Sequence, residues 1–254
     1  MDFVQLPVDG NPKNKKWLLY DASFDYEIGE FDGKTFTSDK KSYLGDYGPK
    51  NFYAGQTFSN SPDKRTVMIG WMNGGGIFQK AEMPFNQQMS FPNTLELKTT
   101  PVGIRLFRWP IKEIDKLYVK TLKLSNLSVE DAVKKLSDIN VELMDLTIEF
   151  ETKSILKLII RGCEVTYDAN LKMFNFGKSK LPAPTCNGKV SLRVLVDRAS
   201  MELFANSGAA VATSYANFIS GNKQISISAE GDIKINSLII NELKSSNAKT
   251  SCAS

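Results

Sequence analysis

The chain has 254 residues and no histidine, and its 32 lysines and arginines are nearly balanced by 28 aspartates and glutamates, for a net charge of +4. Without histidine there is no Ser-His-Asp triad, no Cys-His pair and no histidine-ligated metal, so any hydrolytic chemistry must rest on carboxylates. Basic and acidic residues are interleaved, and no apolar run approaches the ~20 residues that cross a bilayer, so we expect neither a nucleic-acid nor a membrane partner.

The three cysteines, Cys163, Cys186 and Cys252, lack the spacing of a metal site. Their odd number also argues against a complete disulfide framework. We interpret them as small buried residues plus one thiol in the C-terminal tail, and we expect no metal and no cofactor.

Short strands joined by turn residues dominate the first part of the chain. Asp32-Gly33 tolerates the positive φ of a tight turn, which predicts a hairpin of 26–31 and 34–39. A second hairpin is predicted for 94–100 and 103–110. The remaining predicted strands here are 3–8, 17–23 and 65–73.

The second part begins after a polar stretch at 111–116, the natural boundary of the chain. Residues 128–138 (SVEDAVKKLSD) predict one short surface helix, with Ser128 as its N-cap. Long alternating strands with short turns follow, a pattern typical of a β-sandwich. These strands are predicted at 143–152, 154–162, 190–198, 200–206, 223–231 and 233–243.

The loop LGDYGPKNFYAGQTFSN (44–60) crowds aromatic residues among Gly, Pro and Asn. Rings and amides on irregular backbone suit a sugar site, where rings stack on C–H faces and polar groups bind hydroxyls. An equally good interpretation is a capped turn with its rings packed beneath it. The strand in IGWMNGGG (69–76) delivers Trp71 at its end.

Several stretches taken together resemble one family. They are DYG, FYAGQ, IGWMN, MPFNQQMSFP and GIRLFR in this order, preceded by LPVDGN, KWLLYDAS and YEIGEFDGKTF, and followed by LRVLVDRASMELFAN (192–206). The chain is similar over about residues 2–243 to glycoside hydrolase family 32, the β-fructofuranosidases, and within it to bacterial exo-levanases, inulinases and invertases.

The resemblance implies an all-β protein: the distal blades of a five-bladed β-propeller, and therefore an incomplete one, followed by a two-sheet β-sandwich. We expect the propeller part at 1–110, a linker at 111–117, the sandwich at 118–245 and a disordered tail at 246–254. It also implies retaining hydrolysis of terminal β-D-fructofuranosides in fructans or sucrose by an aspartate nucleophile and a glutamate acid/base.

The resemblance places the family's catalytic carboxylates ahead of residue 1, so we expect no catalytic residue here and a chain that is inactive alone. Glu82-Met83-Pro84 imitates the acid/base motif but lies in the wrong place along the family pattern. The acids between Asp21 and Asp32 are better explained as exposed strand and loop groups.

The resemblance carries a substrate-binding role to Tyr53 and Trp71, with Asp46 and Gln56 as weaker candidates for binding hydroxyls. The implied partners are a fructan or sucrose-type carbohydrate and a missing N-terminal propeller half. The alternative is a non-catalytic carbohydrate-binding or interaction module built on the sandwich. The sequence leaves the cellular compartment open.

Overall fold

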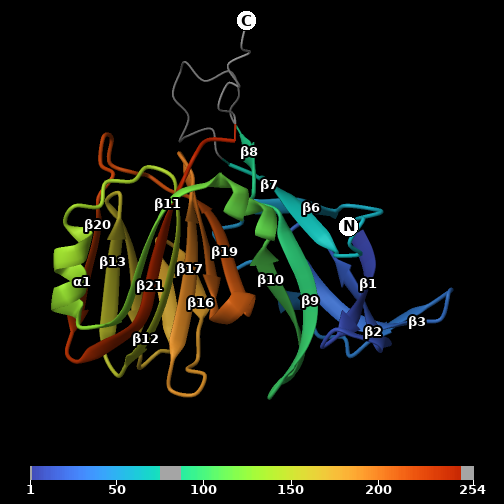
Figure 1. Ribbon diagram of the computed structural model, residues 1–254. Helices are drawn as coiled ribbons and strands as arrows, with labels where there is room; N and C mark the ends of the chain where they lie inside the picture. Colours follow the sequence, from blue (N-terminus) through green and yellow to red (C-terminus); the bar gives the residue numbers. More distant parts are fainter. Residues whose placement is uncertain (1, 75–86, 247–254) are drawn as a thin grey trace, which may run out of the picture.

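The computed structural model describes residues 2–74 and 87–246, and these form an almost entirely β structure of three sheets (Figure 1). No helix within those residues is long and apolar enough to cross a membrane. A ten-stranded sheet forms the propeller part, residues 2–110. A six-stranded and a five-stranded sheet form the sandwich, residues 118–243, so the predicted fold class is confirmed.

The ten-stranded sheet consists of two antiparallel groups, β1–β5 and β6–β10, that meet where β1 runs parallel to β9 at Val8 and Leu97. Side chains such as Leu18, Phe52 and Met68 fill the core of this part. The strands are β1 (Asp2–Val8), β2 (Asn11–Tyr20), β3 (Asp25–Phe31), β4 (Phe36–Ser38), β5 (Tyr43–Leu44), β6 (Phe52–Thr57), β7 (Val67–Met72), β8 (Gln88–Met89), β9 (Asn93–Thr100) and β10 (Gly103–Pro110).

Both predicted hairpins of this part are present, as β3–β4 and β9–β10. The first turn is longer than predicted, because pairing ends at Phe31 and Phe36. The Asp32 carboxylate accepts hydrogen bonds from the N–H groups of Lys34 (2.8 Å) and Thr35 (2.7 Å), and Gly33 takes φ +96°. A side-chain-capped loop therefore replaces the expected two-residue turn.

The sandwich packs its two sheets around one large apolar core. The six-stranded sheet has the order β11-β21-β12-β17-β18-β19, and the five-stranded sheet has the order β16-β15-β14-β13-β20. The bounds are β11 (Tyr118–Leu127), β12 (Met144–Thr152), β13 (Ile155–Ile160), β14 (Cys163–Asp168), β15 (Met173–Phe176), β16 (Ser179–Pro182), β17 (Val190–Val196), β18 (Ser200–Ala205), β19 (Ala210–Tyr215), β20 (Ile225–Glu230) and β21 (Ile233–Leu243).

The predicted helix is α1 (Val129–Leu136), and the Ser128 hydroxyl accepts a hydrogen bond from the Asp131 N–H at 3.1 Å, as expected of an N-cap. The expectation that the cysteines are buried was wrong for Cys186, which is exposed in the turn before β17, and Cys163 is only half-buried. The expected tail falls almost entirely on 247–254, which lie outside the described residues.

Strands β17, β18 and β19 are buried on both faces, which links the sandwich to the propeller part. Along β18, Leu203 points into the sandwich core, whereas its neighbour Phe204 joins a separate cluster with Trp109 and Ile114. Ile114 belongs to the 3-10 helix η2 (Lys112–Leu117), so the expected linker is folded and packed. We call this contact the seam: residues 45–51, 88–91 and 108–117 against the outward face of β17–β19.

Two glycines permit the close approach at the seam. Gly208, in the 3-10 helix η3 (Asn206–Gly208), has φ +90°, and a Cβ there would collide with the carbonyl oxygen of Arg108 on β10. A Cβ at Gly48 would collide with the carbonyl oxygen of Thr213 on β19. Larger residues would force the two parts apart.

Gly208→Ala should therefore destabilise the protein more than a glycine substitution that is strained but free of contacts. Gly188 is the matched control, with φ +79° and open space around its Cβ position. We expect Gly208→Ala to lower the free energy of unfolding, measured by urea denaturation, by about 1–3 kcal/mol more than Gly188→Ala. Equal losses in the two variants would contradict tight packing at the seam.

Candidate functional site

The β6–β7 hairpin carries three of the four predicted substrate-binding residues on one face. Tyr53 pairs with Trp71, and Gln56 pairs with Ile69 two positions along β7. Residues two apart on a strand share a face, so these side chains lie together, while Phe52 and its core neighbours point to the other face. A bulge between Tyr53 and Gln56 keeps Gln56 on the same face despite the spacing of three.

The rings of Tyr53 and Trp71 meet edge to face, with centroids 5.7 Å apart and planes at 72°. Both side chains are half-buried, and Gln56 is exposed with its Nε2 donating to the Gly55 carbonyl at 3.2 Å. Two partly open rings beside an amide offer an apolar surface for sugar C–H groups and a polar group for a hydroxyl. We call this the aromatic–amide face: Tyr53, Gln56, Ile69 and Trp71.

Asp46 does not join the aromatic–amide face. Its side chain is 4% exposed and lies in the seam, 3.0 Å from Nη1 of Arg108. Its other carboxylate oxygen accepts hydrogen bonds from the N–H groups of Gly48 (2.8 Å) and Thr213 (3.1 Å). Burial raises the pKa of Asp46, with Arg108 acting against the rise. Protein groups therefore occupy the oxygens that were expected to bind sugar hydroxyls.

The other rings of the 44–60 loop divide between the two interpretations left open by the sequence. Phe52 is fully buried in the core of the propeller part, and Tyr47 packs against the sandwich core, as beneath a capped turn. Phe58 is 54% exposed, and Tyr53 is half-buried on the aromatic–amide face. Packing therefore accounts for two of the four rings.

Asp2 anchors the start of β1 and was missed by the sequence analysis. Its Oδ2 accepts hydrogen bonds from the Thr57 N–H (3.0 Å), the Thr57 hydroxyl (2.6 Å) and the Tyr20 hydroxyl (2.8 Å). Partial burial acts to raise the pKa of Asp2, but these hydrogen bonds outweigh it and hold the pKa below its ordinary value. No local sequence signal could reveal this, because Thr57 is 55 residues away.

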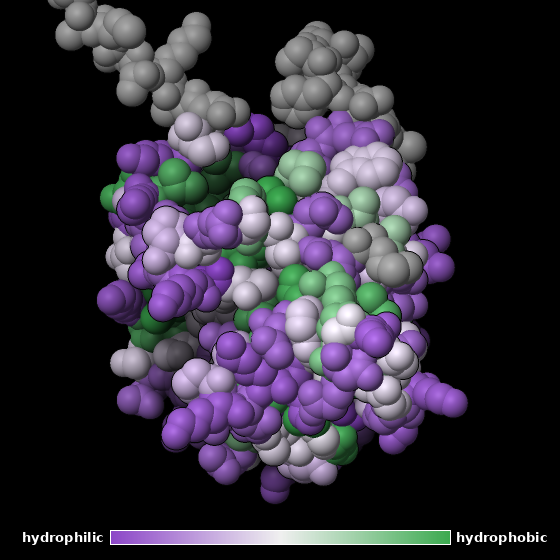
Figure 2. Space-filling view, turned by 90° about the vertical axis from the view of Figure 1, so that its right-hand side faces the viewer, coloured by the Kyte–Doolittle hydropathy of each residue, from purple (hydrophilic) through white to green (hydrophobic). Residues whose placement is uncertain are grey.

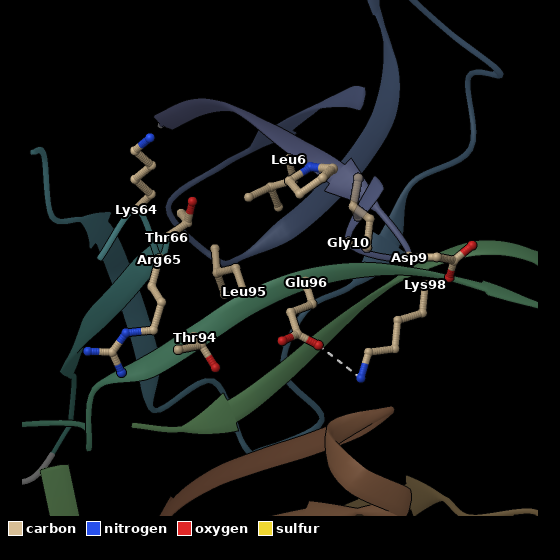
Figure 3. Close-up of a pocket in the computed structure, with 12 residues that line it drawn as sticks. Leu6, Asp9, Gly10, Lys64, Arg65, Thr66, Thr94, Leu95, Glu96 and Lys98 are labelled. Atoms are coloured by element: carbon tan, nitrogen blue, oxygen red, sulfur yellow. Dashed lines mark ion pairs between the residues drawn. The ribbon is translucent and has the colours of Figure 1, made fainter. Parts of the chain in front are cut away.

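A groove of about 560 Å³ runs along the junction of β1 with β9 (Figure 3). Two of its cationic side chains already have acidic partners: Lys98 pairs with Glu96 at 2.9 Å, and Arg65 is bidentate to Glu113, outside the groove lining, at 2.6 and 3.1 Å. It also lacks aromatic rings among its lining residues. We therefore place the candidate site on the aromatic–amide face rather than in this groove.

The remaining acidic residues that were weighed from the sequence give no competing site. Glu82 lies outside the described residues. The acids from Asp21 to Asp32 lie on β3 and in its flanking turns, exposed or half-exposed, as expected. Within 2–74 and 87–246, no cluster of three acidic or cysteine side chains is arranged to hold a metal ion.

Family models match almost the whole chain: the glycosyl hydrolases family 32 N-terminal domain at residues 4–110 and the family 32 C-terminal domain at residues 113–242. The chain belongs to glycosyl hydrolase family 32. Its relatives include a levanase from Bacillus subtilis, 29% identical over 96% of this chain and 42% of the levanase. An extracellular exo-inulinase from Aspergillus ficuum is 26% identical over 80% of this chain and 47% of the inulinase.

Solved structures of the family share this fold. The exo-inulinase of Aspergillus awamori superposes with a TM-score of 0.78 at 22% identity, over 96% of this chain and 56% of the other. A fructofuranosidase of Schwanniomyces occidentalis complexed with fructosylnystose superposes with a TM-score of 0.75 at 21% identity, over 96% of this chain and 59% of the other. The family 32 chain described here thus spans about half the length of the relatives it matches.

The Asp2 anchor leads to a pH-dependent prediction. Asp2→Asn preserves the shape of the side chain but removes its charge. It should lower the free energy of unfolding at pH 7 by about 1 kcal/mol, because solvent partly screens the half-exposed carboxylate. Because the folded pKa is lowered, this stabilisation is present above about pH 4 and is lost as the pH falls through the folded pKa. Urea denaturation across this range should show the gap between variant and wild type closing in acid.

Asp9→Asn is the matched control. Asp9 also accepts hydrogen bonds from one threonine, through the N–H (2.9 Å) and hydroxyl (2.6 Å) of Thr99, but it is exposed. Asp9→Asn should lower the free energy of unfolding less than Asp2→Asn does. A gap for Asp2→Asn that stays constant down to about pH 3 would contradict the anchor.

Proposed function

We propose that this chain serves in the hydrolysis of terminal β-D-fructofuranosides of fructans or sucrose, as the part of a family 32 glycosidase that supplies one wall of the sugar site. The observation that carries the proposal is the aromatic–amide face on a chain matched by both family models. The levanase and inulinases among its relatives are named for fructan substrates.

Retaining cleavage needs two carboxyl groups about 5 Å apart, one attacking and one donating a proton. Two of the buried acids are already held by protein cations: Asp145 accepts from Arg193 (2.6 and 2.9 Å) and Tyr118 (2.5 Å), and Asp46 accepts from Arg108. A third, Glu202, is 0% exposed between β18 and the propeller part, out of reach of a substrate. We therefore propose that the catalytic carboxylates belong to a segment corresponding to the other half of the relatives. On this proposal the 254-residue chain does not release fructose alone.

The face of β1–β4 turned away from the core of the propeller part is a suitable contact surface for such a segment. Phe3 stacks on Trp17 with ring centroids 4.4 Å apart, and Phe31 and Phe36 meet Phe3 edge to face at 5.2 and 5.4 Å. All four side chains are only half-buried. Figure 2 shows apolar groups reaching the surface among polar ones on this side of the molecule. We propose that a preceding propeller blade covers this cluster.

The alternative function, a carbohydrate-binding module on the sandwich, has no specific observation in its favour. The propeller part already covers the outward face of β17–β19. The paired Tyr and Trp rings that suit a sugar lie in the propeller part.

A hybrid enzyme tests the proposal directly. Residues 4–242 of this chain would replace the matched region of the Bacillus subtilis levanase, and fructose release from sucrose, inulin and levan would be measured for the hybrid and for the 254-residue chain. We expect activity from the hybrid and none from the chain alone. Robust fructose release by the chain alone would overturn the assignment of the carboxylates to another segment.

Within the active hybrid, Trp71→Ala should lower kcat/KM for sucrose about tenfold, equivalent to about 1.4 kcal/mol, because the ring that packs against the sugar is removed. Leu171→Ala is the control, since Leu171 is 64% exposed on the sandwich. A loss no greater than that of Leu171→Ala would exclude the aromatic–amide face as the sugar wall.

A further inference from the structure

One cluster in the seam buries an arginine and two acidic side chains from three distant parts of the chain. The Arg108 side chain on β10 is 2% exposed, the Asp46 side chain is 4% exposed, and Glu202 on β18 is 0% exposed. Water therefore cannot screen these charges, and their stability depends on the partners that the protein supplies.

The two acids are bound unequally. Asp46 has an ion pair with Arg108 and two backbone N–H donors, from Gly48 and Thr213. Glu202 has one donor, the Phe91 N–H at 2.6 Å to Oε1. Its Oε2 has no hydrogen-bond partner among the described residues, and neither does the hydroxyl of Thr213, the residue beside both carboxyls.

The cation of this cluster gives its hydrogen bonds to groups other than Glu202. Nη1 of Arg108 donates to the Gly45 carbonyl at 2.9 Å and to Asp46 at 3.0 Å. The guanidinium lies over the rings of Phe52 and Phe24, 4.2 and 4.9 Å from their centroids. Its remaining nitrogens, Nε and Nη2, are buried without partners in the part of the chain that the structure describes.

These contacts determine the net charge of the cluster formed by Arg108, Asp46 and Glu202. With both carboxyls ionised, one guanidinium faces two negative charges, and a net charge remains buried; with one proton added, the group is neutral. Burial raises the pKa of both acids, but Asp46 has the cation and two N–H donors, so we assign the remaining negative charge to Asp46. A proton on Oε2 of Glu202 also gives that oxygen a hydrogen to donate to the Thr213 hydroxyl, which satisfies two unpartnered atoms at once.

We propose that the seam is a pH-sensitive latch: it is closed while Glu202 is protonated, and it loosens when Glu202 ionises beside the charged Asp46. The groups facing Glu202 are Arg108 from β10, Asp46 from the loop before β6, Thr213 from β19 and the Phe91 N–H. Burial raises the pKa of Glu202 to about 8, and Phe91 and Arg108 only partly oppose the rise. The latch would thus respond within the neutral to mildly alkaline range.

The direction of the effect follows from proton linkage. The folded protein holds a proton on Glu202 that the unfolded chain releases above about pH 4, so stability falls as the pH rises from there to the folded pKa and levels off beyond it. The folding equilibrium constant should fall by roughly several hundredfold between pH 5 and pH 8 from this group. A group whose pKa was lowered would show the opposite slope.

Glu202→Gln tests the latch, because glutamine can still accept from Phe91 and donate to Thr213 yet cannot ionise. Hydrogen exchange, corrected for intrinsic rates, would be followed at the seam amides of Tyr47, Phe91 and Thr213 at pH 6 and pH 9. We expect the wild type to lose protection at pH 9 and Glu202→Gln to keep it. Glu164→Gln, which removes an exposed acid of the sandwich, should behave as the wild type.

Equal loss of protection in Glu202→Gln and wild type would overturn the proposal, as would no loss in the wild type. A second measurement does not depend on how the variant folds. In the wild-type chain, carbon-13 NMR of the glutamate side-chain carboxyls should show one signal titrating near pH 8, well above the usual glutamate range. If every glutamate carboxyl titrates below about pH 6, the latch is excluded.

Discussion

The outward face of β17–β19 must be covered, and most of the arrangement of this protein depends on that constraint. These strands are apolar in both directions: Leu203 faces the sandwich core, and Phe204 faces outward. A sheet of this kind is stable only between two layers, and the propeller part provides the second layer. Charged residues within the covered face must then be neutralised by the protein itself, which explains the pairing of Arg108 with Asp46.

The same contact positions the candidate sugar site. The Tyr215 hydroxyl donates to the Met72 carbonyl at 2.6 Å, and the Tyr215 N–H donates to the Asn51 side chain at 3.3 Å. Met72 adjoins Trp71 in β7, and Asn51 lies two residues before Tyr53 at the start of β6. Strand β19 of the sandwich thus holds both strands whose rings form the aromatic–amide face. The sandwich therefore stabilises the position of the aromatic–amide face, although none of the four residues of that face belongs to the sandwich.

The sequence was sufficient for the fold class and for most elements, because strand alternation, turn residues and the Ser128 cap are local signals. It failed where the outcome depends on distant contacts. The burial of Asp46, the double burial of β17–β19 and the anchoring of Asp2 by Thr57 all join segments more than 50 residues apart. Residues 111–117 show the same limit, since nothing in this polar stretch predicted that Ile114 packs into the seam.

The 44–60 loop illustrates why composition alone cannot separate binding from packing. Asp46 and Tyr53 lie seven residues apart in a stretch rich in rings and amides, and both suited a sugar site. The register of β6 with β7 turns Tyr53 toward Trp71, whereas Asp46 lies where the loop meets β19 and Arg108. A carboxylate held by an arginine and two N–H donors is a structural group, and two half-buried rings beside an exposed amide form a surface available to a ligand. The proposed role in fructoside hydrolysis therefore rests on the rings, and the acid that was first grouped with them belongs to the seam that holds them in place.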